Sequence, residues 1–282
     1  MVATLVIFLR EGVEASMIVA ILLAYLNRSG QRQYFRDVWL GVAAALVLAG
    51  GGGVLAYETI KSYDGSRAQT IFETVTYLVA AAVLTYMTFW MRNHARDLSG
   101  ELRARANAAI MTKRARTGIA VLAFQAVGRE GLETVVFTLA IAFSTSRENA
   151  LSGAVIGLAI ALIIAFIIYK LGHRLNMGRF FSIVGALLMV FAAGLLVDAV
   201  ENLQELGWLP FGTNVLWHTT RILSEDGTWG DIAHSFLGYA DQPTILQVIT
   251  YVAYVTAALL MFFKVHTKMR RPLTDREGSR VS

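Results

Sequence analysis

The sequence predicts an all-α membrane protein with seven transmembrane helices, arranged as an inverted repeat of two three-helix units plus a seventh helix. Three observations lead to this prediction. Hydrophobic residues make up 56% of the 282-residue chain and charged residues only 16%, whereas soluble domains carry roughly 25% charged residues. Seven stretches approach the roughly 20 apolar residues that a bilayer-spanning helix needs. A charged five-residue motif also occurs twice, in the first and the fourth of these stretches.

The seven apolar stretches are separated by polar connectors, and they cover residues 2–26, 38–57, 71–91, 118–143, 151–169, 180–200 and 245–263. We therefore expect one transmembrane domain over residues 1–282, with a first repeat at about 1–91 and a second at about 118–200. An outer loop at about 201–244, a last span at about 245–263 and a cytoplasmic tail at 264–282 complete the chain. The first stretch lacks a basic start and a small-residue cleavage site, which favours a retained span over a signal peptide.

Three shorter segments have patterns of their own. Residues 99–113 combine several arginines with apolar residues such as Leu102 and Ile110, which predicts an amphipathic helix on the cytoplasmic membrane surface. The long outer connector at about 201–244, which contains the apolar segment 206–211, predicts a cap or a re-entrant helix over the outer mouth. The glycine run at 50–53 favours tight packing of the second span over an unwound pathway segment.

The positions of the lysines and arginines predict which end of each helix faces the cytoplasm. Nineteen of the 25 lie in the first, third and fifth connectors and in the tail, four lie on the opposite side, and Arg10 and Arg129 lie within spans. Positive residues stay on the cytoplasmic side of a membrane. We therefore expect an outside N-terminus and a cytoplasmic C-terminus in a plasma membrane, with the bacterial inner membrane as the expected location.

Composition and charge exclude several functions. The chain has no cysteine, so disulfides, thiolate metal sites and cysteine nucleophiles are excluded. Its net charge of +5 arises from the cytoplasmic connectors, where contact with lipid headgroups explains the arginines, so nucleic-acid binding is not supported. The sequence contains no nucleotide-binding glycine loop, which argues against direct use of ATP.

The repeated motif is Arg-Glu-Gly-x-Glu, at residues 10–14 and again 119 positions later at residues 129–133. Each copy lies near the middle of its span, where one charged residue costs at least about 2.5–3.5 kcal/mol. Within each helix the two glutamates lie about 60° apart on one face, and the arginine lies one turn from the second glutamate. Because the first and fourth spans run in opposite directions, we expect the two copies to meet near the midplane, where inverted-repeat transporters bind their substrates.

We expect this meeting point to be a metal site. Its candidate ligands are Glu11, Glu14, Glu130 and Glu133, supported by Arg10 and Arg129. These groups sum to a formal charge of −2, and their carboxylate oxygens suit a hard multivalent cation. One ion held jointly by both copies and an ion passed from one copy to the other both fit the pattern. Arginine–glutamate bridges that only pin helices together are less favoured, because ionisable residues inside a membrane are functional by default.

The outer side of the predicted topology is rich in acidic residues. The ones close to apolar runs form a candidate outer relay that concentrates cations at the mouth of the pathway: Glu58, Glu73, Asp198, Glu201 and Glu205. A merely solvated surface is the alternative interpretation. The five histidines (His94, His173, His218, His234 and His266) have no metal-site spacing to one another, so we do not expect them to be ligands.

At the repeated motif the sequence resembles the oxidase-dependent iron permease family, whose hallmark is Arg-Glu-x-x-Glu in the first and fourth of seven spans. Similar features follow in the same order along most of the chain: Phe72-Glu73 to Trp90-Met91, Leu203-Gln204-Glu205-Leu206-Gly207-Trp208, and Leu237-Gly238-Tyr239 with Asp241 and Pro243. One difference is Glu201, close to the place where many bacterial relatives have a histidine. This difference bears on the choice of metal, because lead transporters belong to the same superfamily.

The resemblance implies high-affinity iron import without a cofactor, with the four motif glutamates handling the iron. It also implies an extracytoplasmic partner that oxidises or delivers iron, besides the metal cation and the membrane lipids. From the charge of the site we expect ferric iron to be favoured over ferrous iron. A permease for lead or manganese is the main alternative. A membrane enzyme with a carboxylate-bridged di-metal centre is less favoured, because neither motif has the histidine that such centres carry.

Overall fold

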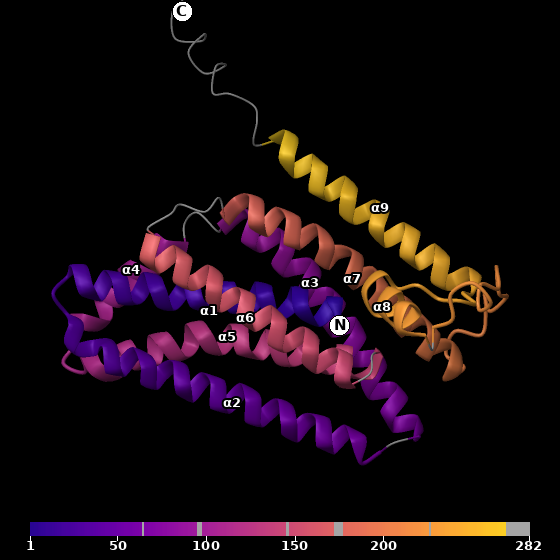
Figure 1. Ribbon diagram of the computed structural model, residues 1–282, viewed down its shortest axis with the longest axis horizontal. Coiled ribbons are helices and arrows are strands. Elements are labelled where there is room, and N and C mark those ends of the chain that lie inside the picture. Colours follow the sequence, from indigo (N-terminus) through magenta and orange to yellow (C-terminus); the bar gives the residue numbers. More distant parts are fainter. Residues whose placement is uncertain (64, 95–97, 145–146, 172–176, 226, 269–282) are drawn as a thin grey trace, which may run out of the picture.

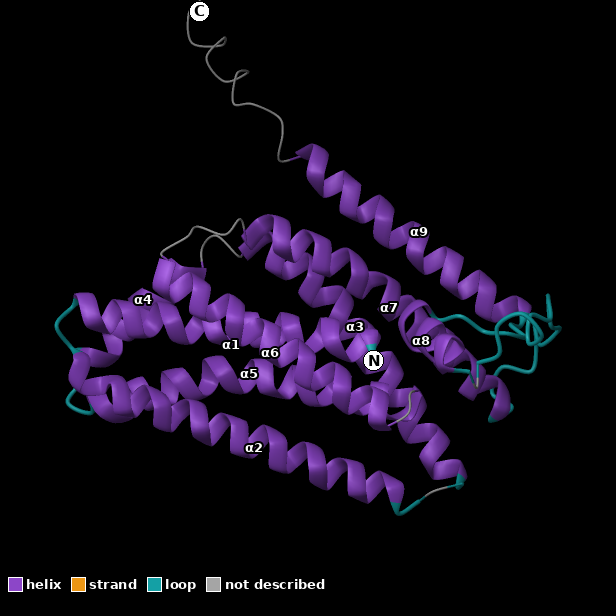
Figure 2. Ribbon diagram, in the orientation of Figure 1, coloured by secondary structure: helices purple, strands orange, loops and turns teal. Residues whose placement is uncertain are grey.

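Figures 1 and 2 show a computed structural model of the chain, in which helices are joined by turns and loops. The structure describes residues 1–282 apart from 64, 95–97, 145–146, 172–176, 226 and 269–282. The long helices are α1 (Val2–Arg28), α2 (Phe35–Lys61), α3 (Arg67–His94), α5 (Ala115–Ser144), α6 (Arg147–Leu171), α7 (Met177–Glu205) and α9 (Ile245–Lys268). Shorter helices are η1 (Arg32–Tyr34), α4 (Leu98–Ile110) and α8 (Thr228–Leu237). The predicted all-α class is confirmed, and each apolar stretch lies within one long helix.

Among the described residues, four helices are long and apolar enough to cross a membrane: Arg32–Lys61, Arg67–Met91, Glu148–Ile167 and Ser182–Glu205. Ile245–Met261 is a shorter apolar helix. α1 and α5 are of similar length, but each carries the three charged residues of the repeated motif near its middle. Large apolar side chains face outward from the bundle, such as Val47 of α2 at 74% exposure and Ile163 of α6 at 58%. Such faces are typical of helices surrounded by lipid.

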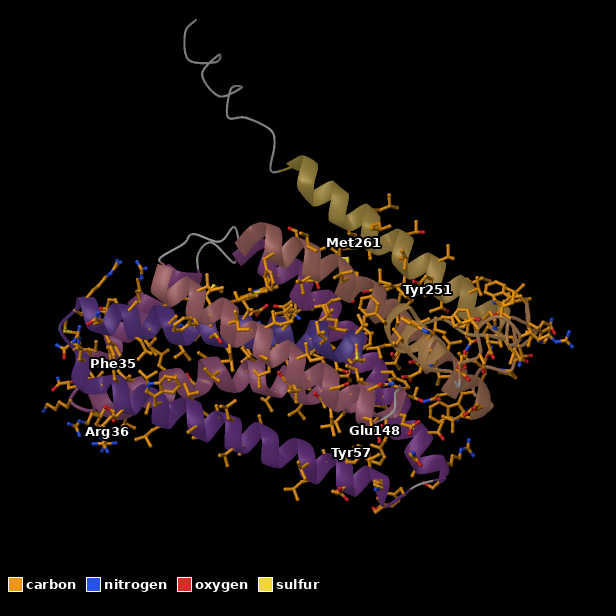
Figure 3. All side chains as sticks on the ribbon, in the orientation of Figure 1. Phe35, Arg36, Tyr57, Glu148, Tyr251 and Met261 are labelled. Atoms are coloured by element: carbon orange, nitrogen blue, oxygen red, sulfur yellow. The ribbon has the colours of Figure 1, made fainter. Side chains whose placement is uncertain are left out.

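The long helices pack in three main pairs. α1 packs along α6, α2 along α5 and α3 along α7, while α1 and α5 also contact each other. Figure 1 shows α9 at the edge of the bundle, where it packs against α7. In Figure 3, Arg36 at the start of α2 lies at one end of the bundle, and Tyr57 lies at the other end, as does Glu148 at the start of α6. α1 ends where α2 starts, and α5 ends where α6 starts, and these two points lie at opposite ends of the bundle. α1 and α5 therefore cross the bundle in opposite directions, as the sequence predicts.

Glycines bring two of these pairs into close contact. A Cβ atom added to Gly153 of α6 would lie 2.2 Å from the carbonyl oxygen of Met1, at the start of α1. A Cβ atom added to Gly41 of α2 would lie 2.2 Å from the carbonyl oxygen of Ala120 in α5. Met1 and Ala120 are 119 positions apart, like the two copies of the charged motif. The α1–α6 and α2–α5 interfaces thus begin with matching contacts.

The glycines inside the two motifs make a second matching contact. A Cβ atom on Gly12 would lie 2.7 Å from the Cβ of Ala161, and one on Gly131 would lie 2.9 Å from the Cβ of Ala49. The two alanines are 112 positions apart, as are the two glycines of the first contact. A missing side chain therefore lets a neighbouring helix pass directly beside the charged residues in each motif.

The glycine run at 50–53 behaves differently. A Cβ atom would meet nothing within 4 Å at Gly50, Gly51 or Gly52, whereas at Gly53 it would lie 3.1 Å from a methyl group of Val135. The prediction of tight packing is therefore wrong for the first three glycines. They lie on the side of α2 that faces away from the bundle, where no close contact requires a glycine.

Gly41→Ala and Gly153→Ala are each expected to destabilise the folded protein by about 2–3 kcal/mol, because each new methyl group overlaps a backbone carbonyl oxygen of the facing helix. Gly51→Ala is the matched control, since open space surrounds that position and alanine favours a helix over glycine by about 1 kcal/mol. Unfolding of the purified protein in mixed detergent micelles measures the three effects. Equal stability of all three variants would contradict the close contacts.

Two hydrophobic clusters lie on either side of the repeated motif. One contains Ile7 of α1 and Phe137 of α5, packed against residues of α3 and α7. The other contains Leu22 of α1 and Ile119 of α5, packed against residues of α2 and α4. In both α1 and α5 the motif falls between these clusters along the helix. The charged groups are therefore enclosed by apolar packing above and below.

The helix predicted for residues 99–113 is confirmed as α4, but its apolar residues do not face outward as expected for the membrane surface: Leu102 is buried in the cluster that α4 shares with α1 and α5. Many of the basic residues that predict the orientation lie in this connector and in the two others on the same side. Residues 95–97 and 172–176 of these connectors, and the tail from 269 on, lie outside the described residues.

The connector 201–244 is expected to form a cap or a re-entrant helix. Its helix is α8, and the apolar residues 206–211 are not helical. Residues 206–211 form turns, bends and loop that follow the end of α7. Gly207 and Gly212 have φ angles of 73° and 67°, which a right-handed helix does not use. The large apolar side chains of this segment, Trp208 and Phe211, are more than half exposed. The cap over this end of the bundle is formed by α8 instead, which packs against α7.

Candidate metal site

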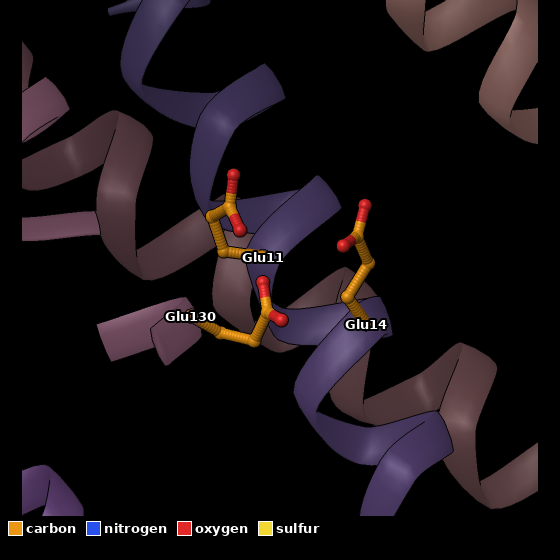
Figure 4. Close-up of side chains that lie close together, drawn as sticks. All are labelled: Glu11, Glu14 and Glu130. Carbon is orange, nitrogen blue, oxygen red and sulfur yellow. The ribbon is translucent and has the colours of Figure 1, made fainter. Parts of the chain in front are cut away.

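Three buried glutamates from the two motifs converge between α1 and α5. Glu11 and Glu14 come from α1 and Glu130 comes from α5, and one carboxylate oxygen of each lies within 4.8 Å of the others. Figure 4 shows the three carboxyl groups side by side. The three residues are 3%, 2% and 5% exposed, respectively. The fold thus brings together three of the four predicted ligands, and we call them the glutamate cluster.

Arg10 neutralises part of the charge of this cluster. Its Nε donates a hydrogen bond to Oε1 of Glu14 and its Nη1 donates one to Oε1 of Glu11, both at 3.1 Å. The Arg10 side chain is only 3% exposed, so these ion pairs are enclosed by protein. Three carboxylates and one guanidinium group leave a formal charge of −2 when all are ionised. A multivalent cation is the natural counterion for such a buried excess of negative charge.

The second motif has a different arrangement. Arg129 donates a hydrogen bond to Glu133 of its own helix at 3.1 Å, and its guanidinium group lies 4.5 Å from the ring centre of Trp90. Its Nη2 also lies 2.9 Å from the sulfur atom of Met87. The Arg129 side chain is 41% exposed, in contrast to the buried Arg10. Glu133 is thus paired with Arg129 of its own motif. It lies beside the glutamate cluster, close enough for its charge to act on Glu14.

Several buried polar atoms of the site have no hydrogen-bond partner among the described residues. They include Oε2 of Glu11, Glu130 and Glu133 and Nη2 of Arg10. A buried acceptor without a donor costs about 1–3 kcal/mol, and more when the group is charged. Carboxylate oxygens in that position are suited to ligate a cation. The donor set contains oxygen and neither imidazole nor sulfur, as the sequence predicts for a hard ion.

A cavity of about 220 Å³ leads from the glutamate cluster toward α4. Glu14 and Glu130 line it together with Arg129, and Glu101 and Arg105 of α4 line it as well. Glu101 and Arg105 form an ion pair of 2.6 Å, with both side chains more than half exposed. The cluster is therefore connected to the end of the bundle that carries α4 and the basic connectors.

The residues of the candidate outer relay are distributed over three helices. Asp198 and Glu201 lie one turn apart in α7, where Asp198 is buried and Glu201 accepts a hydrogen bond of 3.0 Å from Gln247 of α9. Glu73 of α3 is partly buried. Glu58, near the end of α2, and Glu205, at the end of α7, are exposed.

Sequence reasoning missed His234 of α8 as a neighbour of these acidic residues. Its Nε2 lies 3.9 Å from Oδ1 of Asp198, and its Nδ1 lies 3.9 Å from Oε1 of Glu225. Burial alone would lower the pKa of His234, but Asp198, the carbonyl of Tyr239, Glu225 and Glu201 together raise this pKa above its usual value. The contribution of the charged ring to stability is therefore full below about pH 6.5 and is lost as the pH rises through the raised pKa. No sequence spacing links α7 to α8, so this proximity could be found only in the fold.

Known proteins are similar to this chain along almost its whole length. The model of the iron permease FTR1 family matches residues 1–271 of the chain. A protein of Yersinia pseudotuberculosis named ferrous iron permease EfeU is 33% identical over 258 residues, which are 91% of this chain and 90% of the relative. The ferrous iron permease EfeU of Escherichia coli O6:K15:H31 is 31% identical over 257 residues, covering 91% of this chain and 93% of the relative. No solved structure matches the chain.

Proposed function

The chain belongs to the iron permease FTR1 family, and from this membership we propose that it imports iron across the membrane, with the ion bound by the glutamate cluster. The observation that carries the proposal is the cluster itself: three carboxylates from two opposed helices, buried within 4.8 Å of one another, with a formal charge of −2 after pairing with Arg10. The relatives are named as permeases, which agrees with a transporter and gives no support to a di-metal enzyme.

Glu133 is the fourth ligand in our proposal. Its Oε2 is buried without a hydrogen-bond partner among the described residues, while its Oε1 accepts from Arg129. Glu130 of the same motif already belongs to the cluster with Glu11 and Glu14. We therefore favour one ion held jointly by residues of both motifs, with Glu133 as the further ligand from the second motif.

We further propose that all seven long helices span the membrane as an inverted repeat plus a last helix. The matched contacts at the α1–α6 and α2–α5 interfaces support this architecture. In the proposed repeat, a two-fold relation that exchanges α1 with α5 would also exchange α2 with α6, and it would convert each of these interfaces into the other. The two motifs would then lie at equal depth, as in transporters whose substrates bind between inverted repeats.

The proposed orientation has the N-terminus outside and the C-terminus in the cytoplasm, in a bacterial inner membrane. The basic connectors support it through the positive-inside rule. In this orientation the cavity beside α4 opens to the cytoplasm, so the structure corresponds to a state from which iron is released inward. The acidic residues Glu58, Glu73, Asp198, Glu201 and Glu205 then lie on the outer side, where a negative field concentrates cations.

The oxidation state of the imported iron is a separate prediction. The charge of the site led us to favour ferric iron, whereas the relatives are named ferrous iron permeases. Both ions accept carboxylate ligands, so the type of ligand does not distinguish them. The charge of the site favours ferric iron, and the names of the relatives favour ferrous iron. If ferric iron is the substrate, an extracytoplasmic partner that oxidises or delivers iron is required next to the outer face, because the chain itself carries no redox cofactor in our proposal.

The proposed function is tested by radio-iron uptake into cells that lack their own high-affinity iron transport. Cells with and without the protein receive iron either as a ferric chelate or as ferrous iron kept reduced by ascorbate, alone or with a tenfold excess of manganese or lead. We expect iron uptake that depends on the protein and that neither competitor suppresses. Absence of uptake of both iron forms, or preferential uptake of manganese or lead, would overturn the proposal.

A further inference from the structure

A second group of metal-binding side chains lies where α8 packs against the end of α7. Asp198 of α7 is only 7% exposed, and its Oδ1 is buried without a hydrogen-bond partner among the described residues. His234 of α8 directs its Nε2 toward this oxygen at 3.9 Å. Glu201 lies one helical turn beyond Asp198 and acts electrostatically on both groups. None of these residues belongs to the glutamate cluster.

A contact between two glycines sets this arrangement. A Cβ atom on Gly238, which ends α8 with a φ angle of 66°, would lie 2.4 Å from the Cα of Gly194 in α7. The two backbones therefore touch at this point. Asp198 lies one turn after Gly194, and His234 lies one turn before Gly238. The close contact thus fixes the register in which the carboxylate and the imidazole face each other.

The hydrogen bond on the other side of the ring determines what Nε2 can do. Nδ1 of His234 lies 2.9 Å from the carbonyl oxygen of Tyr239, and a carbonyl can only accept, so Nδ1 carries a proton. In the neutral ring of His234, Nε2 then carries no proton, and its lone pair faces a carboxylate oxygen of Asp198. Two acceptors directed at each other are stable only with a cation between them, either a proton on Nε2 or a metal ion. Backbone carbonyls commonly orient metal-binding histidines in this way.

We propose that His234 and Asp198, with the negative charge of Glu201 one helical turn away, form an extracytoplasmic binding site for a divalent first-row transition metal ion, which holds the ion before it enters the membrane pathway. Two ligands about 2.1 Å from one ion are about 3.0 Å apart at a right angle and about 4.2 Å apart on opposite sides of it. The observed 3.9 Å lies within this range, so little movement is required. One imidazole and one carboxylate suit ions such as Fe²⁺ and Mn²⁺. The binding site stands on its own geometry, whereas its place in transport rests on the proposed function.

The site differs chemically from the glutamate cluster because it contains nitrogen. Mn²⁺ is therefore a suitable probe, since pulsed electron paramagnetic resonance detects an imidazole nitrogen bound to it. The test uses the purified full-length protein in lipid nanodiscs with less than one equivalent of Mn²⁺. Four variants are compared with wild type: His234→Gln, Asp198→Asn, His218→Gln as the matched control for an exposed histidine of the same loop, and Glu14→Gln as the control for the cluster.

We expect a nitrogen-coupled Mn²⁺ signal in wild type, His218→Gln and Glu14→Gln. We expect His234→Gln and Asp198→Asn to lose this signal and to bind Mn²⁺ at this site at least about tenfold more weakly. Size-exclusion profiles and Mn²⁺ binding that depends on Glu14 show that the variants remain folded. Absence of the signal in wild type, or its persistence in either of the two site variants, would overturn the proposal. In cells, His234→Gln is expected to raise the KM of uptake with Vmax retained. Mn²⁺ binding to the purified protein needs no transport. The binding test of this site can therefore succeed even if the wild-type protein imports no iron, so the two proposals fail separately.

Discussion

Glu130→Gln is expected to reduce iron uptake roughly 100-fold at matched membrane expression. The substitution keeps the size of the side chain and removes one of the three charged groups of the glutamate cluster. Loss of one partner from a buried charged group costs about 3 kcal/mol or more, and each 1.4 kcal/mol corresponds to about a factor of ten in binding. Glu14→Gln is expected to have a similar effect, since Glu14 belongs to the same cluster and also lines the cavity toward α4.

Glu148→Gln is the matched control for these two variants. Glu148 is an exposed glutamate at the start of α6, outside the cluster and the cavity. Its uptake is expected to equal that of wild type. Near-normal uptake by Glu130→Gln or Glu14→Gln, with the protein present in the membrane, would show that the cluster is not on the path of the ion. The motifs would then be ion pairs that hold α1 and α5 together.

Glu133→Gln distinguishes the two ways in which the motifs can cooperate. Glu133 is paired with Arg129, whereas Glu130 is directed into the cluster with Glu11. If one ion is held jointly, Glu133→Gln and Glu130→Gln weaken the binding of the same ion. If the ion is passed on, Glu133→Gln slows its release and leaves binding to the purified protein intact. Iron binding and uptake, measured on the same variant, separate these outcomes.

The sequence was sufficient to predict the long helices and the position of the charged motifs near the middle of α1 and α5. Each long helix contains one apolar stretch, because a run of apolar residues leaves the backbone no partner except its own hydrogen bonds in lipid. The spacing of Glu11 and Glu14 placed both on one face, and they do converge with Glu130. Periodicity along a chain determines such local relations. For α4 the sequence predicts the helix but not its neighbours, because Leu102 packs against α1 and α5 instead of the membrane.

What the sequence did not predict depends on contacts between distant segments. The identical motifs predicted equivalent arginines, yet Arg10 is buried between two glutamates while Arg129 is drawn toward Trp90 and Met87 of α3. The sequence predicts a cap or a re-entrant helix for the connector 201–244 but not which of its residues are helical: the helix is α8, and the apolar residues 206–211 form turns, bends and loop. His234 gave no signal at all, since its neighbours come from the end of α7 and from a separate loop.

Arg10→Gln is expected to destabilise the folded protein by about 3–5 kcal/mol. The arginine is buried and is the donor to both Glu11 and Glu14, so its loss leaves two buried carboxylates without a charged partner. Arg129→Gln is the matched comparison in the other motif. Its side chain is 41% exposed and pairs with Glu133 alone among the described acidic residues, so a loss of about 1 kcal/mol or less is expected. Unfolding in mixed detergent micelles measures both, and equal losses would contradict the asymmetry between the motifs.

The double variant Arg10→Gln/Glu11→Gln separates the stabilising role of Arg10 from the transport role of the glutamates. Removing a buried charge together with its partner is far less costly than removing one of the two, so the double variant is expected to regain most of the stability lost in Arg10→Gln. Its uptake is expected to stay near background, because one carboxylate of the cluster is gone. If stability returns and uptake does not, the glutamates act on the ion and Arg10 acts on the glutamates. If uptake returns with stability, the cluster requires only a folded bundle, and Glu11 is not a ligand.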